Sequence, residues 1–116
     1  ALKDCAGLIS NAGFETPAEA MALGIPMVVK PLLGQPEQIL NAGGLAKLGR
    51  AHVMYKLDPK AVNRMLNQES CLRVSWGDVA GPLAQWVADG ASELTLPAMT
   101  ERVWNKVTMQ EVSVSK

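Results

Sequence analysis

Short apolar runs alternate with segments that carry helix signals along the first half of the chain. Three short segments are predicted as strands: residues 6–10, 26–30 and 51–57. The one at 26–30 is an almost continuous apolar run, as in a parallel strand covered on both faces. A segment with helix signals follows each run: residues 17–23, 36–48 and 59–66. Strands separated by crossover helices of this length predict a parallel sheet with right-handed connections. The pattern therefore predicts an α/β fold, a Rossmann-like parallel sheet with flanking helices.

Capping residues mark where these helices begin and end. Gly24 follows the first helical segment and is a natural C′ residue. Asp58 and Pro59 begin the third helix as an N-cap followed by proline at the first helical position. Thr16 and Glu19 have the spacing of a capping box, in which each side chain accepts a hydrogen bond from the other residue's backbone N–H. A purely structural role would be enough to explain these two residues.

The pattern changes after residue 66. Residues 67–78 are predicted to be irregular, and residues 79–88 and 94–108 are predicted to be helical. The tail at residues 110–116 is predicted to be frayed. Three tryptophans of this half are expected to seal the helices onto one another or onto the sheet: Trp76, Trp86 and Trp104. We therefore expect residues 1–66 to form a βαβαβα unit and residues 67–116 to close the same domain.

Composition and charge narrow the function classes. The 116 residues are 48% hydrophobic, and 11 basic residues balance 11 acidic ones, so no overall field would attract nucleic acid. No run reaches the roughly 18 apolar residues of a transmembrane helix, and no signal peptide is visible. Cys5 and Cys71 have no metal-binding spacing and are expected to stay reduced. We expect a cytoplasmic location. Peripheral attachment of a full-length protein to the inner face of the membrane is the alternative that we leave open.

Polar residues gather where the predicted strands end and helices begin. The carboxyl ends of parallel strands meet at one edge of a sheet, where helix N-termini favour phosphorylated ligands. Gly13 lies in the first of these turns, where the lack of a Cβ lets an anion approach the backbone. Glu37, Gln38 and Asn41 begin the next helix and suit sugar hydroxyls, because a carboxylate accepts hydrogen bonds and the two amides both accept and donate them. A solvated helix start is the alternative interpretation.

These residues carry a resemblance to a known family. Residues 4–59 resemble the donor-binding half of the GT-B glycosyltransferases, a group that includes the UDP-glycosyltransferases and the family 28-like N-acetylglucosaminyltransferase of bacterial peptidoglycan lipid synthesis. The signature is a glycine turn, Ser/Thr with Glu three residues later, a G-x-P strand, and an acidic-Gln pair followed by Asn. Its positions here are Gly13, Thr16, Glu19, Gly24-Ile25-Pro26, Glu37-Gln38 and Asn41.

The resemblance implies a role for each matching residue. It places the diphosphate of a nucleotide sugar at Gly13, Phe14, Glu15 and Thr16. It places the ribose hydroxyls at Glu19, and the donor sugar at Glu37 and Gln38. It assigns no catalytic residue, no metal and no cofactor to this chain.

The resemblance also implies the activity. It is the donor-binding part of a glycosyltransferase that transfers a hexose-type sugar from a UDP-sugar to an unknown acceptor. The chain begins at Ala1 with what reads as the tail of a helix, so we expect a truncated second half of a GT-B C-terminal domain. The acceptor site and catalytic base would then belong to a missing N-terminal Rossmann domain, and the chain alone would be inactive. A non-catalytic nucleotide-sugar binding module and a structural α/β interaction domain are the alternatives.

Two further expectations follow for the sheet. His52, the single histidine, is assigned to the core or edge of a strand and not to a base. The strand at residues 6–10 is expected to be an unprotected apolar edge, with Leu8 and Ile9 lacking cover.

Overall fold

The computed structural model describes residues 1–114, which divide into two compact units. Residues 1–73 and 111–114 form the first unit, and residues 74–110 form the second. The elements follow one another as a short 3-10 helix η1 (Leu2–Asp4), β1 (Leu8–Ser10), α1 (Glu15–Leu23), β2 (Met27–Val29), α2 (Pro36–Lys47), β3 (Ala51–Val53), α3 (Pro59–Leu66), β4 (Ser70–Ser75), α4 (Ala80–Ala88), α5 (Leu96–Trp104) and β5 (Thr108–Ser113).

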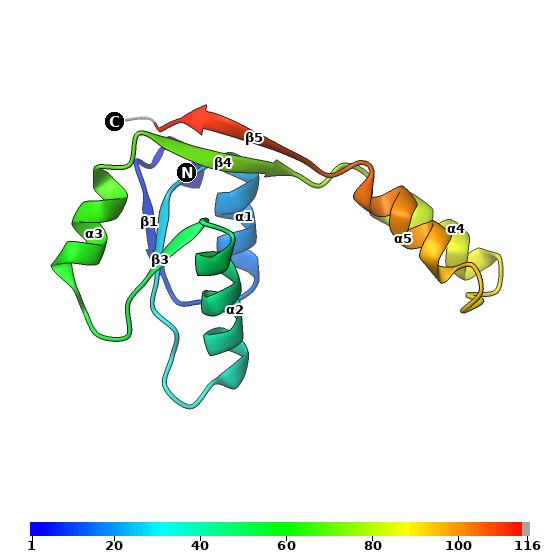
Figure 1. The fold of residues 1–116 in the computed structure, drawn as a ribbon, viewed down its shortest axis with the longest axis horizontal. Coiled ribbons are helices and arrows are strands. Elements are labelled where there is room, and N and C mark those ends of the chain that lie inside the picture. Colours follow the sequence, from blue (N-terminus) through cyan, green and yellow to red (C-terminus); the bar gives the residue numbers. More distant parts are fainter. Residues whose placement is uncertain (115–116) are drawn as a thin grey trace. The chain divides into compact units, whose positions relative to one another are not determined.

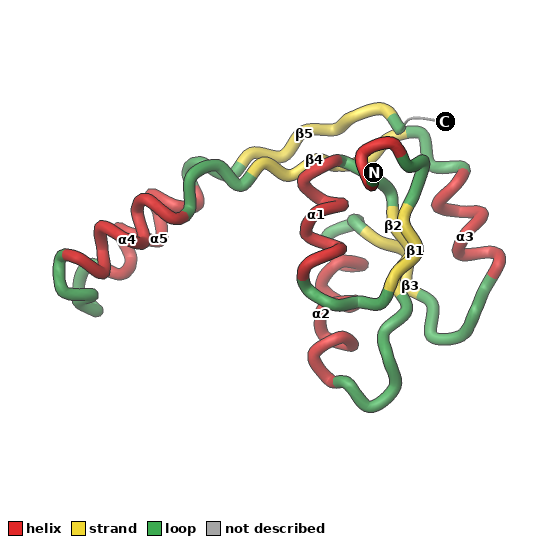
Figure 2. The backbone as a smooth tube through the Cα atoms, turned by 180° about the vertical axis from the view of Figure 1, so that it is seen from behind, coloured by secondary structure: helices red, strands yellow, loops and turns green. Residues whose placement is uncertain are grey.

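The first unit is built on a three-stranded parallel sheet in the order β1-β2-β3. Its register pairs Ile9 with Val28, and Val28 with His52. Helices α1 and α2 lie on one side of this sheet and α3 on the other (Figures 1 and 2). The predicted α/β fold with a parallel sheet and flanking helices is confirmed, and β1 is an edge strand as expected.

The core of the first unit forms around the central strand. All three residues of β2 are at most 1% exposed, because a central parallel strand is covered on both faces. Val28 packs with Met54, Ala61 and Met65, which brings α3 onto the sheet. The apolar run that predicted β2 therefore correctly marked the core.

The strands are shorter than predicted, and the third differs most. An apolar run predicted a strand to residue 57, but β3 ends at Val53. Met54 N–H still donates to Val29 O at 3.0 Å, and beyond this point β2 offers no further partner because it too has ended. Leu57 is consequently 82% exposed in the loop that leads to α3.

Two of the three predicted helix boundary signals are confirmed. Gly24 caps α1 in the left-handed conformation with φ 71°, and the Asp58 side chain accepts a hydrogen bond from Lys60 N–H at 2.9 Å. The predicted capping box is wrong, because α1 begins at Glu15 with Phe14 as its N-cap. Thr16 therefore lies inside the first turn, where its side chain cannot act as the cap.

The structure has two strands where the sequence predicted none. Residues 70–75 form β4 and residues 108–113 form β5, and the two pair as a separate two-stranded sheet. The predictions of an irregular segment at 67–78 and of fraying from residue 110 are wrong over these residues. Residues 115 and 116 of that predicted tail lie outside the described part of the chain.

The second unit contains the helices α4 and α5, which pack against each other. Trp86 Nε1 donates to Ser92 O and to Thr95 Oγ1, both at 3.1 Å, and so ties α4 to the turn before α5. The expected sealing role holds for Trp86, whereas Trp104 remains 58% exposed. The predicted helix at 94–108 is shorter at both ends: α5 begins at Leu96 and ends at Trp104, and Thr108 already belongs to β5.

Candidate functional site

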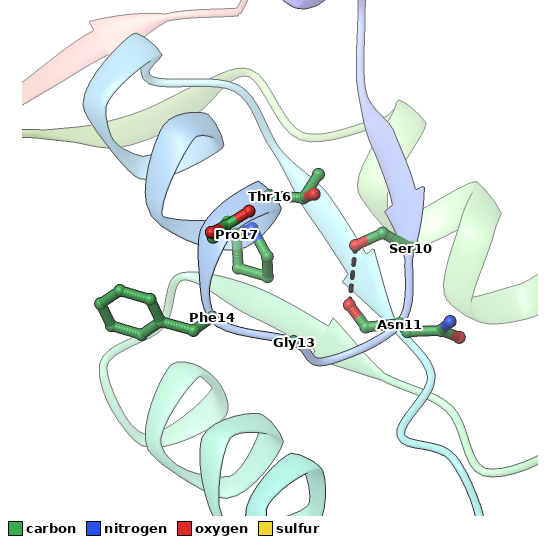
Figure 3. Close-up of a pocket in the computed structure, with 7 residues that line it drawn as sticks. Ser10, Asn11, Gly13, Phe14, Thr16 and Pro17 are labelled. Carbon is green, nitrogen blue, oxygen red and sulfur yellow. Dashed lines mark hydrogen bonds between the residues drawn. The ribbon is translucent and has the colours of Figure 1, made fainter.

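A hollow of about 530 Å³ opens at the carboxyl end of β1 (Figure 3). It is lined by Ser10, Asn11, Gly13, Phe14, Glu15, Thr16 and Pro17. The structure thus brings together the four residues that the resemblance assigned to a diphosphate. Ser10, Asn11 and Pro17 were not predicted as lining residues, although Ser10 ends the first apolar run and Pro17 begins the predicted helix.

Backbone N–H groups without acceptors are the main feature of this hollow. Within residues 1–114, the N–H groups of Gly13, Phe14, Glu15 and Thr16 donate to no protein atom. Pro17 has no N–H, and Ala18 N–H is the first to bond inside the helix, to Phe14 O at 3.2 Å. No side chain caps α1, so the positive end of the helix dipole is open toward the hollow.

The turn leaves free space beside its glycine. A Cβ built on Gly13 would meet no atom within 4 Å, and Gly13 is not among the residues with positive φ. Neither packing nor backbone conformation of the described chain therefore requires a glycine here. The Phe14 side chain, 76% exposed, points away from Ser10 and Asn11 in Figure 3.

The charge of the hollow is negative. Glu15 is the one charged residue among the described residues that line it. An anionic ligand would therefore depend on backbone N–H groups and the helix dipole, since no lysine or arginine contributes to the lining. The described residues also contain no group of three or more His, Cys, Asp or Glu placed to hold a metal ion.

Glu19 lies one turn further along α1 and is exposed. It does not line the hollow, and its carboxylate makes no hydrogen bond or ion pair within the described chain. The carboxylate is therefore free to accept hydrogen bonds from a ligand that extends from the hollow along the helix.

Glu37 and Gln38 begin α2, but their side chains differ in what they contact. Glu37 is exposed and makes no hydrogen bond within the described residues. Gln38 Oε1 accepts from Leu32 N–H at 3.0 Å, and Gln38 Nε2 donates to Gln35 Oε1 at 2.9 Å. Gln38 therefore holds the β2–α2 loop in place.

Asn41 joins the two helix starts that the sequence singled out. Its Nδ2 donates to Ala12 O at 3.1 Å, across 29 residues of sequence. The loop that forms the hollow is therefore anchored to α2. The spacing of Asn41 after Gln38 was visible in the sequence, but this partner was not.

His52 lies apart from this hollow. It is half-buried in β3 and lines a second hollow of about 380 Å³ together with Ala46, Gly49, Ala51, Arg64 and Gln68. Its position in a strand agrees with the prediction that it belongs to the core or edge of the sheet.

Comparison with known proteins gives one match. The family model described as glycosyl transferase family 1 matches residues 1–69 of the 116, which includes all the residues of the hollow. No curated protein and no solved structure matches. In residues 1–114 no helix has both the length and the apolar character needed to cross a membrane. Because the match covers more than half of the chain, the protein belongs to glycosyl transferase family 1.

Proposed function

We propose that this chain binds a nucleotide-sugar donor for glycosyl transfer, with the diphosphate in the hollow at the start of α1. One observation carries the proposal: four successive backbone N–H groups lie without acceptors in the hollow, inside the segment that matches the family. Consecutive N–H groups at a helix N-terminus bind phosphate oxygens through hydrogen bonds and the helix dipole. The donor that best fits the sequence motif is a UDP-sugar.

Glu15 limits how the diphosphate can sit. An ionised carboxylate that faces the phosphates would repel them. We therefore place the diphosphate against the backbone of residues 13–16, with the Glu15 side chain directed to solvent. The exposure of Glu15 makes this orientation available without burying its charge.

Glu19 is proposed as the ribose ligand. An ionised carboxylate accepts two hydrogen bonds from adjacent hydroxyls, and Glu19 is exposed one turn beyond the diphosphate site. Because the capping box is not formed, the Glu19 carboxylate has no structural task that would compete with ribose.

The donor sugar is proposed to lie against Glu37 and Gln38. Glu37 offers an unengaged carboxylate, whereas Gln38 already bonds Leu32 and Gln35. A sugar can therefore contact Glu37 directly. Gln38 would contact the sugar only through the amide lone pair or N–H that its hydrogen bonds to Leu32 and Gln35 do not use. This difference predicts that Glu37 contributes more to sugar selectivity than Gln38 does.

The chain's contribution to catalysis would be stabilisation of the leaving group. Displacement at the anomeric carbon leaves negative charge on the nucleoside diphosphate, and preorganised N–H donors stabilise that charge more as it develops. We assign no catalytic base to this chain, and we propose that a second domain supplies the base and the acceptor site. The isolated chain is then expected to bind donor without transferring sugar.

A substitution at Glu19 tests the proposed ribose contact. Glu19→Gln is expected to weaken UDP binding about tenfold, because a charged hydrogen-bond acceptor is lost. The free energy of unfolding should change by less than about 0.5 kcal/mol, since the side chain is exposed and unpaired. Calorimetric titration with UDP and denaturant unfolding measure the two quantities.

Glu101→Gln is the matched control, an exposed helical glutamate of α5 in the second unit. It removes the same charge and should leave the affinity for UDP unchanged. Equal affinities for UDP in the wild-type protein and in Glu19→Gln would rule out the ribose contact.

A further inference from the structure

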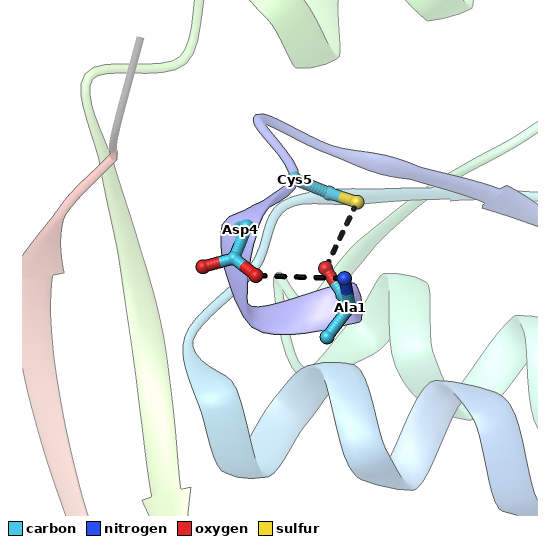
Figure 4. Close-up of polar contacts among 3 residues, drawn as sticks. All are labelled: Ala1, Asp4 and Cys5. Atoms are coloured by element: carbon cyan, nitrogen blue, oxygen red, sulfur yellow. Dashed lines mark hydrogen bonds and ion pairs between the residues drawn. The ribbon is translucent and has the colours of Figure 1, made fainter.

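The side chain of Asn41 connects two elements that are far apart in the sequence. Its Nδ2 donates to Ala12 O at 3.1 Å, from α2 to the loop between β1 and α1. Several other side chains also donate to backbone carbonyls, but to near neighbours: Cys5 Sγ, for example, donates to Ala1 O four residues away (Figure 4). Within residues 1–114, no other hydrogen bond holds residues 11–13 to a segment distant in sequence.

This hydrogen bond fixes the orientation of one peptide group. Ala12 O and the Gly13 N–H belong to the same peptide group, which is planar and trans, so the two point in opposite directions. Because Asn41 holds the carbonyl toward α2, the Gly13 N–H is directed away from α2. This N–H is the first of the four that have no acceptor in the described chain. Asn41 therefore determines which end of the peptide group is offered to a ligand.

Gly13 makes the opposite orientation of this peptide group accessible. A half-turn of the group changes ψ of Ala12 and φ of Gly13, and glycine adopts positive φ about as readily as negative φ. In the structure the φ of Gly13 is not positive, and a Cβ there would meet no atom within 4 Å. In the turned orientation the Ala12 carbonyl would take the place of an N–H donor, and its partial negative charge would repel a diphosphate.

We propose that Asn41 is a positioning residue, whose hydrogen bond keeps the peptide group between Ala12 and Gly13 in the orientation that binds phosphate. This inference rests on the diphosphate site proposed above. Asn41 does not line the hollow, so it acts through the backbone and not by contact with the ligand. The amide NH₂ of asparagine can donate to a carbonyl, whereas a carboxylate of the same shape cannot.

Asn41→Asp tests this role in the absence of ligand. The carboxylate would repel Ala12 O, and it would accept from the Gly13 N–H once the peptide group has turned. In ¹H–¹⁵N spectra of the 116-residue chain, we expect the Gly13 amide of the variant to move downfield and to exchange more slowly with solvent than in the wild type. The shift should also follow the titration of the new carboxylate, because the protonated acid can donate to Ala12 O again. A folded variant whose Gly13 amide keeps its wild-type shift and exchange rate would overturn the proposal.

The affinity for UDP measures the consequence for the site. Asn41→Asp should weaken UDP binding about thirtyfold, because the site loses an N–H donor and gains a carbonyl and a negative charge. Asn41→Ala covers the case in which the aspartate variant does not fold. It should weaken binding about threefold, because only part of the molecules then hold the binding orientation. Calorimetric titration measures both, and an Asn41→Ala protein that binds UDP as tightly as the wild type would contradict the role of Asn41.

Asn63→Asp and Asn63→Ala are the matched controls. Asn63 is an exposed asparagine of α3 whose side chain makes no hydrogen bond within residues 1–114. Both variants should leave the Gly13 amide and the affinity for UDP unchanged. The two proposals can fail separately: a wild-type protein that does not bind UDP would refute the diphosphate site, whereas the Gly13 amide of unliganded Asn41→Asp reports on the peptide group alone.

Discussion

At the scale of single residues, the glycines differ in whether the structure requires them. Gly24 has φ +71°, and a Cβ there would lie 2.7 Å from Val112 Cγ2 and 3.1 Å from Arg73 Cβ. Gly43, inside α2, has free space around the same built atom. The sequence predicted Gly24 as the end of a helix, but its close approach to β5 depends on a strand that the sequence did not reveal.

Alanine substitutions should separate these two glycines. Gly24→Ala should lower the free energy of unfolding by about 1–3 kcal/mol, because both the left-handed backbone and the contact with Val112 oppose a side chain. Gly43→Ala, the matched control, should raise it by up to about 1 kcal/mol through helix propensity. Denaturant unfolding monitored by circular dichroism measures both, and a Gly24→Ala protein as stable as wild type would contradict the packing described here.

At the scale of elements, local signals predicted the first unit well and failed where partners are distant. The parallel sheet follows from apolar runs and crossover helices, which are both local features. The β4–β5 pair joins segments more than thirty residues apart, and the two buried residues of β4, Cys71 and Val74, are three positions apart and do not follow the two-residue period of a strand. With so few buried apolar positions, the sequence of this segment lacks the alternation of apolar and polar residues from which a strand is predicted. The candidate site could be predicted as residues in a loop, whereas its free N–H groups depended on where α1 begins.

The exposed edge of β1 leads to a prediction of self-association. β1 pairs on one side only, and Ile9 on this edge is 53% exposed. N–H groups of a parallel strand alternate between its two sides, so part of β1 is open to another chain. The protein should form dimers or larger species as concentration rises, and Ile9→Lys should reduce them. Light scattering after size-exclusion chromatography measures this, with Leu40→Lys on the exposed side of α2 as the control. A wild-type protein that stays monomeric at all concentrations would refute the open edge.

At the scale of the whole molecule, the chain has one unit that carries the family match and one that does not. The match ends at residue 69, and the first unit continues to residue 73, where the chain enters the second unit. The second unit buries little apolar surface, since Val74 and Pro82 are its buried residues among those described. The donor-binding role proposed here therefore rests on the first unit alone. Its central claim is that the backbone at the start of α1 binds a diphosphate.

Amide chemical shifts during a titration with UDP test that claim most directly. In ¹H–¹⁵N spectra of the uniformly labelled chain, we predict saturable shifts that are largest for the N–H groups of residues 13–16, because these groups have no acceptor before the ligand binds. Uridine without phosphates should leave these four amides almost unchanged. No saturable shift at residues 13–16, or shifts confined to the hollow beside His52, would contradict the proposed diphosphate site.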